Sequence, residues 1–121
     1  MTDSDRILGM VREGRYSVSI RHIELQRPWR GILVVHVRHA LKSAAVVNCE
    51  DGSAVLRGTD VDGRILEMPV KPILSSFRSC GSWKEAELVH VLTAYIPDGK
   101  TNDTIRQLIY RLRRIFLGGR P

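Results

Sequence analysis

The stretch AVVNCEDGSAVLRGTDVDGRILEMPV, residues 45–70, decides the fold that the sequence predicts. It contains three segments rich in branched apolar residues, and each of the two turns between them includes Asp and Gly. Branched residues favour extended backbone, and Asp and Gly favour tight turns. The stretch therefore predicts an antiparallel meander. We expect Pro69 and Pro72 to end its third strand or to place that strand at an edge, because proline donates no ladder hydrogen bond.

The segments around this meander complete a predicted α+β core. Apolar residues at helical spacing predict a helix over about residues 5–13. Residues 33–42 fit a strand or a helix, and we prefer the helix. Residues 71–87 show no period and are rich in serine, which predicts a long loop. The alternation in residues 87–97 predicts a fourth strand. We therefore expect N-terminal helices packed on a four-stranded antiparallel sheet.

The C-terminal segment, about residues 102–117, predicts a basic amphipathic helix. Its apolar residues recur at helical spacing: Ile105, Leu108, Ile109, Leu112, Ile115 and Phe116. Its opposite side carries Tyr110 among three arginines, Arg106, Arg113 and Arg114. One interpretation is that the helix docks on the sheet or on a second subunit. The other is that it binds phosphate or a membrane surface.

Length and composition indicate one domain over residues 1–121, with a core at about 5–98. The net charge is +6, and residues 101–121 hold five arginines against one aspartate. This excess favours RNA, DNA or an acidic protein as a partner. No apolar run is long enough to cross a membrane, and the acidic N-terminus is unlike a signal peptide. With only two cysteines, we expect a bacterial-type cytoplasmic protein.

The stretch SIRHIELQRPWRGI, residues 19–32, holds the candidate chemistry. Ser19 is placed as the N-cap of a short helix, and His22 then falls in its first turn. The positive end of the helix dipole favours a neutral imidazole, which suits an acid/base role near neutral pH. Pro28 should end this helix near Gln26 or Arg27. A histidine and Arg30 on either side of one short helix could share an anionic ligand, although a lone histidine is more often a hydrogen-bonded surface or half-core residue.

Two further groups of residues have both a structural and a functional interpretation. Zinc could in principle be held by a set comprising His36, His39, Cys49, Cys80 and His90. No matched Cys-x-x-Cys pair accompanies them, so we expect ordinary packing, no metal and no cofactor. Trp29 and Trp83 are expected to anchor a core or an interface.

Several short motifs occur in an order that resembles a known family. They are REGRY, SIRH, RGI, VLRGTDVDGR and VLTAY. The corresponding positions are Ser19 with His22, Arg30-Gly31-Ile32, Gly58 with Asp62-Gly63-Arg64, and Thr93-Ala94-Tyr95. Over about residues 5–98 the chain is similar to the bacterial domain of unknown function 4258 family, within the RelE/BrnT-like toxin superfamily.

The resemblance implies a RelE-like fold and a toxin-type protein that binds RNA or cleaves it without a metal. In that chemistry His22 is the base or acid, Arg30 holds the phosphate, and Tyr95 is a second proton donor or a stacking platform. The residues expected to bind nucleic acid are Arg27, Arg57, Arg64, Arg106 and Arg113. The implied partners are RNA, an antitoxin-like protein and a second copy of the chain. The alternative is a non-catalytic interaction module that dimerises or docks a partner through its C-terminal helix.

Overall fold

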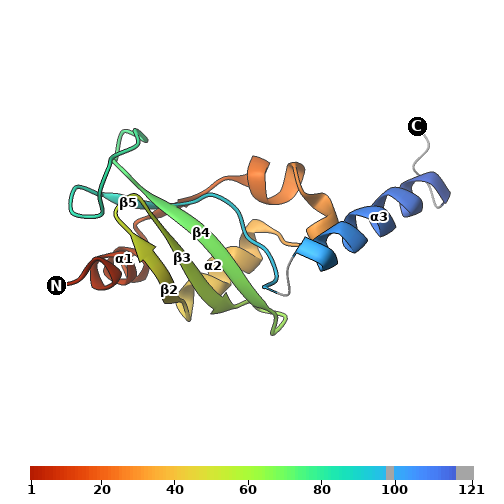
Figure 1. The fold of residues 1–121 in the computed structure, drawn as a ribbon, viewed down its shortest axis with the longest axis horizontal. Helices are drawn as coiled ribbons and strands as arrows, with labels where there is room; N and C mark the ends of the chain where they lie inside the picture. Colours follow the sequence, from red (N-terminus) through yellow and green to blue (C-terminus); the bar gives the residue numbers. More distant parts are fainter. Residues whose placement is uncertain (98–99, 117–121) are drawn as a thin grey trace.

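Five strands form one mixed sheet in the computed structural model, which describes residues 1–97 and 100–116 (Figure 1). The strands are β1 (Tyr16–Val18), β2 (Ala45–Glu50), β3 (Ser53–Thr59), β4 (Ile65–Ile73) and β5 (Leu88–Val91), in the order β1-β5-β4-β3-β2. The α+β class and the meander β2-β3-β4 are confirmed. The expected sheet of four antiparallel strands is wrong, because β1 adds a fifth strand parallel to β5. Three residues are too few to show a period of two, so the sequence did not reveal this edge strand.

Three α-helices and two single helical turns accompany the sheet. They are α1 (Asp3–Arg12), η1 (Arg21–Leu25), η2 (Pro28–Arg30), α2 (Val34–Lys42) and α3 (Lys100–Phe116). The first begins with a capping box in which Thr2 and Asp5 bond each other's backbone N–H groups. Both predicted N-terminal helices are confirmed, with bounds that differ from the expected ones by one or two residues.

One face of the sheet forms the core with α1 and α2. Alternate residues of the three central strands point to these helices and are buried: Leu56, Leu66, Met68, Val70, Val89 and Val91. Trp83 is fully buried, and its indole N–H donates to the carbonyl of Ser53. It thus anchors the core, as expected. The opposite face, here called the outer face, carries polar residues that include Ser17, Arg57, Glu67, Lys71 and His90.

The two prolines of β4 do not end the strand or place it at an edge, so that expectation is wrong. The strand continues through both and lies between β3 and β5. Each proline lies where a neighbouring strand has just ended. The Pro69 carbonyl accepts from the N–H of Leu92, one residue beyond β5. The Pro72 carbonyl accepts from Cys80, because the β3 ladder has already ended at Ala54. Neither missing N–H therefore interrupts a strand pair.

The connection between β4 and β5 is shorter than the predicted loop. The first three of residues 71–87 continue β4 to Ile73, and the rest form a connection with turns. The predicted fourth strand over 87–97 is also shorter, because β5 ends at Val91. Tyr95 then forms an isolated bridge with Glu67, which returns the chain to the edge of β4.

Helix α3 extends away from the sheet (Figure 1). Its contacts with the domain include those with η2. Five residues of its apolar stripe are between 44% and 68% exposed: Ile105, Leu108, Ile109, Leu112 and Ile115. The helix does not dock on the sheet, so that alternative is wrong and its apolar side is uncovered.

No helix within residues 1–97 and 100–116 combines the length and the apolar content needed to cross a membrane.

Candidate nucleic-acid interface

The turn between β3 and β4 is built around a buried aspartate. Asp60 is 2% exposed, and its Oδ1 accepts from the backbone N–H groups of Asp62 at 2.9 Å and Arg64 at 2.8 Å. Its Oδ2 accepts from Nε of Arg64 at 2.8 Å. Burial alone would raise the pKa of Asp60, but the hydrogen bonds and positive charge of Arg64 outweigh burial and lower it. The turn therefore fixes the position of one guanidinium group.

Three arginines line one open cleft of about 560 Å³. Arg57 comes from β3, Arg64 from the turn just before β4, and Arg106 from α3. Ile65, Ile96 and Pro97 supply apolar walls. None of the described residues that line the cleft is acidic. The structure thus brings together Arg57 and Arg64, which flank the turn in sequence, with an arginine some forty residues further on.

A carboxylate that the sequence analysis did not select holds two of the expected site residues. Glu67 accepts from Nε of Arg57 at 3.0 Å and forms an ion pair with its Nη2. The Tyr95 hydroxyl donates to Glu67 Oε1 at 3.1 Å. Burial, with the hydrogen bond and charge of Glu67, raises the pKa of Tyr95. Tyr95 therefore keeps its proton and shares it with Glu67.

Arg30 donates hydrogen bonds to the segment that follows β5. Its Nη1 donates to Thr93 Oγ1 at 3.2 Å and to the carbonyl of Ala94 at 3.0 Å. Its guanidinium carbon lies 5.9 Å from the centre of the Tyr95 ring, within cation–π distance. Arg30 and Tyr95 therefore meet, as expected for one site, but both have structural partners.

His22 lies apart from the cleft. It is exposed on η1, and its Nδ1 is 3.0 Å from Ser19 Oγ. The same hydroxyl accepts from the backbone N–H of His22 at 3.3 Å, so Ser19 acts as the expected cap even though the π-helical turn starts at Arg21. The turn ends with Gln26 as its C-cap, which confirms the stop predicted from Pro28.

Two other expected nucleic-acid contacts also lie outside the cleft. Arg27 precedes η2 and Arg113 lies on α3, and both are exposed. Neither lines the space between Arg57, Arg64 and Arg106.

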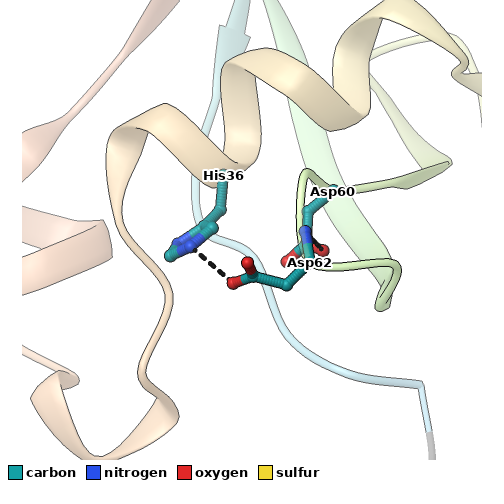
Figure 2. Close-up of side chains that lie close together, drawn as sticks. All are labelled: His36, Asp60 and Asp62. Atoms are coloured by element: carbon teal, nitrogen blue, oxygen red, sulfur yellow. Dashed lines mark hydrogen bonds and ion pairs between the residues drawn. The ribbon is translucent and has the colours of Figure 1, made fainter.

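A histidine and two carboxylates gather where α2 meets the turn (Figure 2). Ligand-type atoms of His36, Asp60 and Asp62 lie within 4.8 Å of one another. His36 Nδ1 accepts from the backbone N–H of Leu33 at 2.8 Å, so the ring proton is on Nε2, which donates to Asp62 at 3.0 Å. Asp60 already accepts three hydrogen bonds. This cluster therefore fastens the turn to α2.

The zinc candidates from the sequence do not form one cluster within the described part of the chain. His39 Nδ1 is 3.2 Å from the Thr59 carbonyl. Cys49 and Cys80 are free thiols, and burial, with the charge of Asp3, raises the pKa of Cys49. These residues are accounted for by local hydrogen bonds and packing.

Comparison of the chain with protein-family models, with curated proteins and with solved structures found no match. The family resemblance therefore stays a prediction, and the geometry of the cleft carries the functional argument.

Proposed function

We propose that this protein is an RNA-binding domain of the RelE-like toxin type that holds phosphates in the cleft between Arg57, Arg64 and Arg106. The observation that carries the proposal is the meeting of three guanidinium groups from distant parts of the chain in one open cleft. Guanidinium groups bind phosphate oxygens through paired N–H donors, and several of them in one groove follow a nucleic-acid backbone.

The carboxylates beside the cleft orient two of its arginines without occupying all their donors. Arg57 uses Nε and Nη2 on Glu67, and Arg64 uses Nε on Asp60 and Nη2 on the carbonyl of Gly31. In both cases Nη1 has no partner among the residues described. Arg106 makes one long contact, from Nη1 to the Arg30 carbonyl at 3.5 Å. Each arginine thus keeps donors for a phosphate, and two are held rigidly before RNA arrives.

Metal-independent cleavage of the bound RNA is the activity that we propose for this domain. His22 has an exposed imidazole and is the acid/base candidate. Arg30 and Tyr95 support the strand end beside the cleft, and their fixed positions suit contact with a phosphate and a base respectively.

Replacement of Arg106 tests the binding proposal with little effect on the fold. We expect Arg106→Gln to weaken binding of a fluorescent oligoribonucleotide roughly fivefold, the loss of about 1 kcal/mol for one exposed charged hydrogen bond. Fluorescence anisotropy measures the affinity. Arg78→Gln is the matched control, because Arg78 is exposed in the β4–β5 connection and outside the cleft. Equal weakening by both variants would contradict specific use of the cleft.

A second candidate function rests on α3. Four exposed residues of its stripe, Ile105, Leu108, Leu112 and Ile115, repeat at the alternating three- and four-residue spacing of a two-helix coiled coil. In this alternative the chain is a non-catalytic module that dimerises through α3. The docking of an antitoxin-like protein on the same stripe would produce a different complex, with one copy of this chain.

Truncation after Lys100 tests this alternative. We expect the shortened chain to keep its sheet, because the core residues precede α3, and to associate less strongly. Light scattering should show a dimer for the full chain and one copy for the truncated chain and for Leu112→Asp. A mass per particle that is the same in all three proteins would exclude dimerisation through α3.

A further inference from the structure

Two histidines, His90 on the outer face of the sheet and His22 on η1, are each held at Nδ1 by a serine. Ser17 Oγ is 2.7 Å from Nδ1 of His90, and Ser19 Oγ is 3.0 Å from Nδ1 of His22. Ser17 lies in β1 and Ser19 directly follows its last residue, so chain connectivity keeps their Cα atoms within about 7 Å of each other. The two imidazoles, which are 68 positions apart in sequence, are thus both tied to this short segment, and they lie close enough for the charge of His22 to act on His90.

The serines leave the other ring nitrogen of each histidine available. When Nδ1 carries the proton it donates to the serine oxygen, and Nε2 has a free lone pair. When the serine hydroxyl donates to Nδ1, Nε2 carries a proton instead. Nε2 of His22 and of His90 has no hydrogen-bond partner in the described part of the chain. Both nitrogens can therefore act on a ligand as acid or as base.

A lysine completes this group. Lys71 on β4 and Ser17 on β1 are the register partners of His90 on its two sides, so the three residues form one row across the sheet. The Lys71 ammonium donates to Ser79 Oγ at 3.4 Å and retains other donors. Burial lowers the pKa of His90, and the charges of Lys71 and His22 lower it further. His90 is thus a neutral base at pH 7.

We infer that His90 and His22, together with Lys71, form the acid–base centre of a metal-independent ribonuclease. The inference rests on the proposed function, because RNA must first be bound. Two histidines and a cation suffice for cleavage within the RNA strand itself, since its 2′-hydroxyl is the nucleophile.

The reaction needs no co-reactant. Nε2 of His90 takes the proton of the 2′-hydroxyl, and the 2′-oxygen forms a bond to phosphorus. The bond from phosphorus to the 5′-oxygen breaks, and that oxygen keeps the electron pair and takes a proton from Nε2 of protonated His22. Lys71 balances the charge on the non-bridging oxygens. The products are a 2′,3′-cyclic phosphate and a 5′-hydroxyl, and proton exchange with water restores both rings.

The centre is within reach of RNA held in the arginine cleft. Glu67, which binds Arg57, and Lys71 are both on the outer face of β4. Glu67 and Lys71 are four residues apart in an extended β-strand, so about 13 Å separates their Cα atoms. An RNA segment of a few nucleotides can span this distance. An RNA strand anchored at Arg57 can therefore cross the outer face to His90.

Cleavage of a fluorescent oligoribonucleotide in EDTA tests the inference. We expect the full chain to produce 2′,3′-cyclic phosphate ends and to leave DNA intact. His90→Ala and His22→Ala should each lower the cleavage rate at least about 100-fold. Their affinity for a 2′-O-methyl strand, which cannot be cleaved, should stay within about twofold. His39→Ala is the control, because that exposed histidine lies on α2, where its Nδ1 is bonded to the Thr59 carbonyl.

The pH profile separates a catalytic role for His90 from a structural one. The rate should fall on acidification as His90 gains a proton, with the midpoint below the ordinary histidine value of 6.5. Lys71→Gln should move this midpoint upward, because it removes a positive charge that lowers the pKa of His90. Ser17→Ala, which frees the ring, should lower kcat with little change in KM, and Ser17→Thr should restore it.

The outcomes distinguish the two proposals. Arginine-dependent binding of the 2′-O-methyl strand without any cleavage of RNA would overturn the histidine centre and leave RNA binding intact. Cleavage that is unchanged in folded His90→Ala would also overturn it. Absence of RNA binding by the wild-type chain would instead overturn the proposed function.

Discussion

Gly58→Ala is expected to destabilise the protein more than any other substitution considered for this fold. Gly58 is on the buried side of β3, and a Cβ atom built there would lie 2.0 Å from the carbonyl oxygen of Ala40 and 2.8 Å from its carbonyl carbon. Both clashing atoms belong to the backbone of α2, so no side-chain rotation relieves the contact. Helix and sheet would have to separate, which we expect to cost about 4 kcal/mol, a large part of the stability of a domain of this size.

Urea unfolding followed by circular dichroism measures this effect. Gly9→Ala is the control, because nothing lies within 4 Å of a Cβ at Gly9 in α1. That variant should gain about 0.5–1 kcal/mol from helix propensity. A midpoint for Gly58→Ala equal to the wild-type value would show that α2 does not lie against β3 in the way described.

Asp60→Ala should have the second-largest effect, because one buried carboxylate holds the whole β3–β4 turn. Its removal leaves two backbone N–H groups and Nε of Arg64 without their acceptor. We expect a loss of about 3 kcal/mol in unfolding free energy and weaker RNA binding, because Arg64 is no longer aimed into the cleft. Asp51→Ala, in the exposed β2–β3 turn, is the control and should stay within about 0.5 kcal/mol of wild type.

The difference in unfolding free energy between wild type and Asp60→Ala should also depend on pH, and the direction of that dependence follows from the pKa of Asp60. The pKa of Asp60 is lower in the folded state than its ordinary value of 3.8. Its stabilising contribution is therefore complete above that value and is lost as the pH falls through the lower folded-state pKa. The difference in unfolding free energy between wild type and Asp60→Ala should be constant from pH 7 to pH 5 and should shrink towards pH 2. A difference that grows on acidification would contradict the assigned hydrogen bonds.

Local sequence signals predicted the elements but not their assembly. The turn residues Asp51-Gly52 and Asp62-Gly63 predicted the meander, and helical periodicity predicted α1, α2 and α3. The parallel pair β1 and β5 was missed, because it joins segments some seventy residues apart and β1 is only three residues long. The effect of the prolines was also misjudged. Whether a strand tolerates proline depends on where its neighbours end, which a single segment does not show.

The part of the candidate site that is formed by residues close together in sequence could be predicted. Arg57 and Arg64 flank one turn, and the structure brings both to one cleft. Their carboxylate Glu67 was missed, although a hairpin register would have placed it opposite Arg57. His22 was expected beside these arginines, but it lies near His90, which the sequence suggested only as a zinc candidate. The position of η1 relative to the sheet depends on tertiary packing, and short-range patterns carry no information about it.

The central claim is that RNA phosphates occupy the cleft of Arg57, Arg64 and Arg106. The most direct measurement follows the arginine side-chain Nε–H signals by nuclear magnetic resonance while an oligoribonucleotide is added to the ¹⁵N-labelled protein. We predict that the signals of these three arginines shift progressively and saturate together, while the signal of Arg78 stays in place. Binding of RNA with no shift at the three arginines, or with an equal shift at Arg78, would contradict the claim.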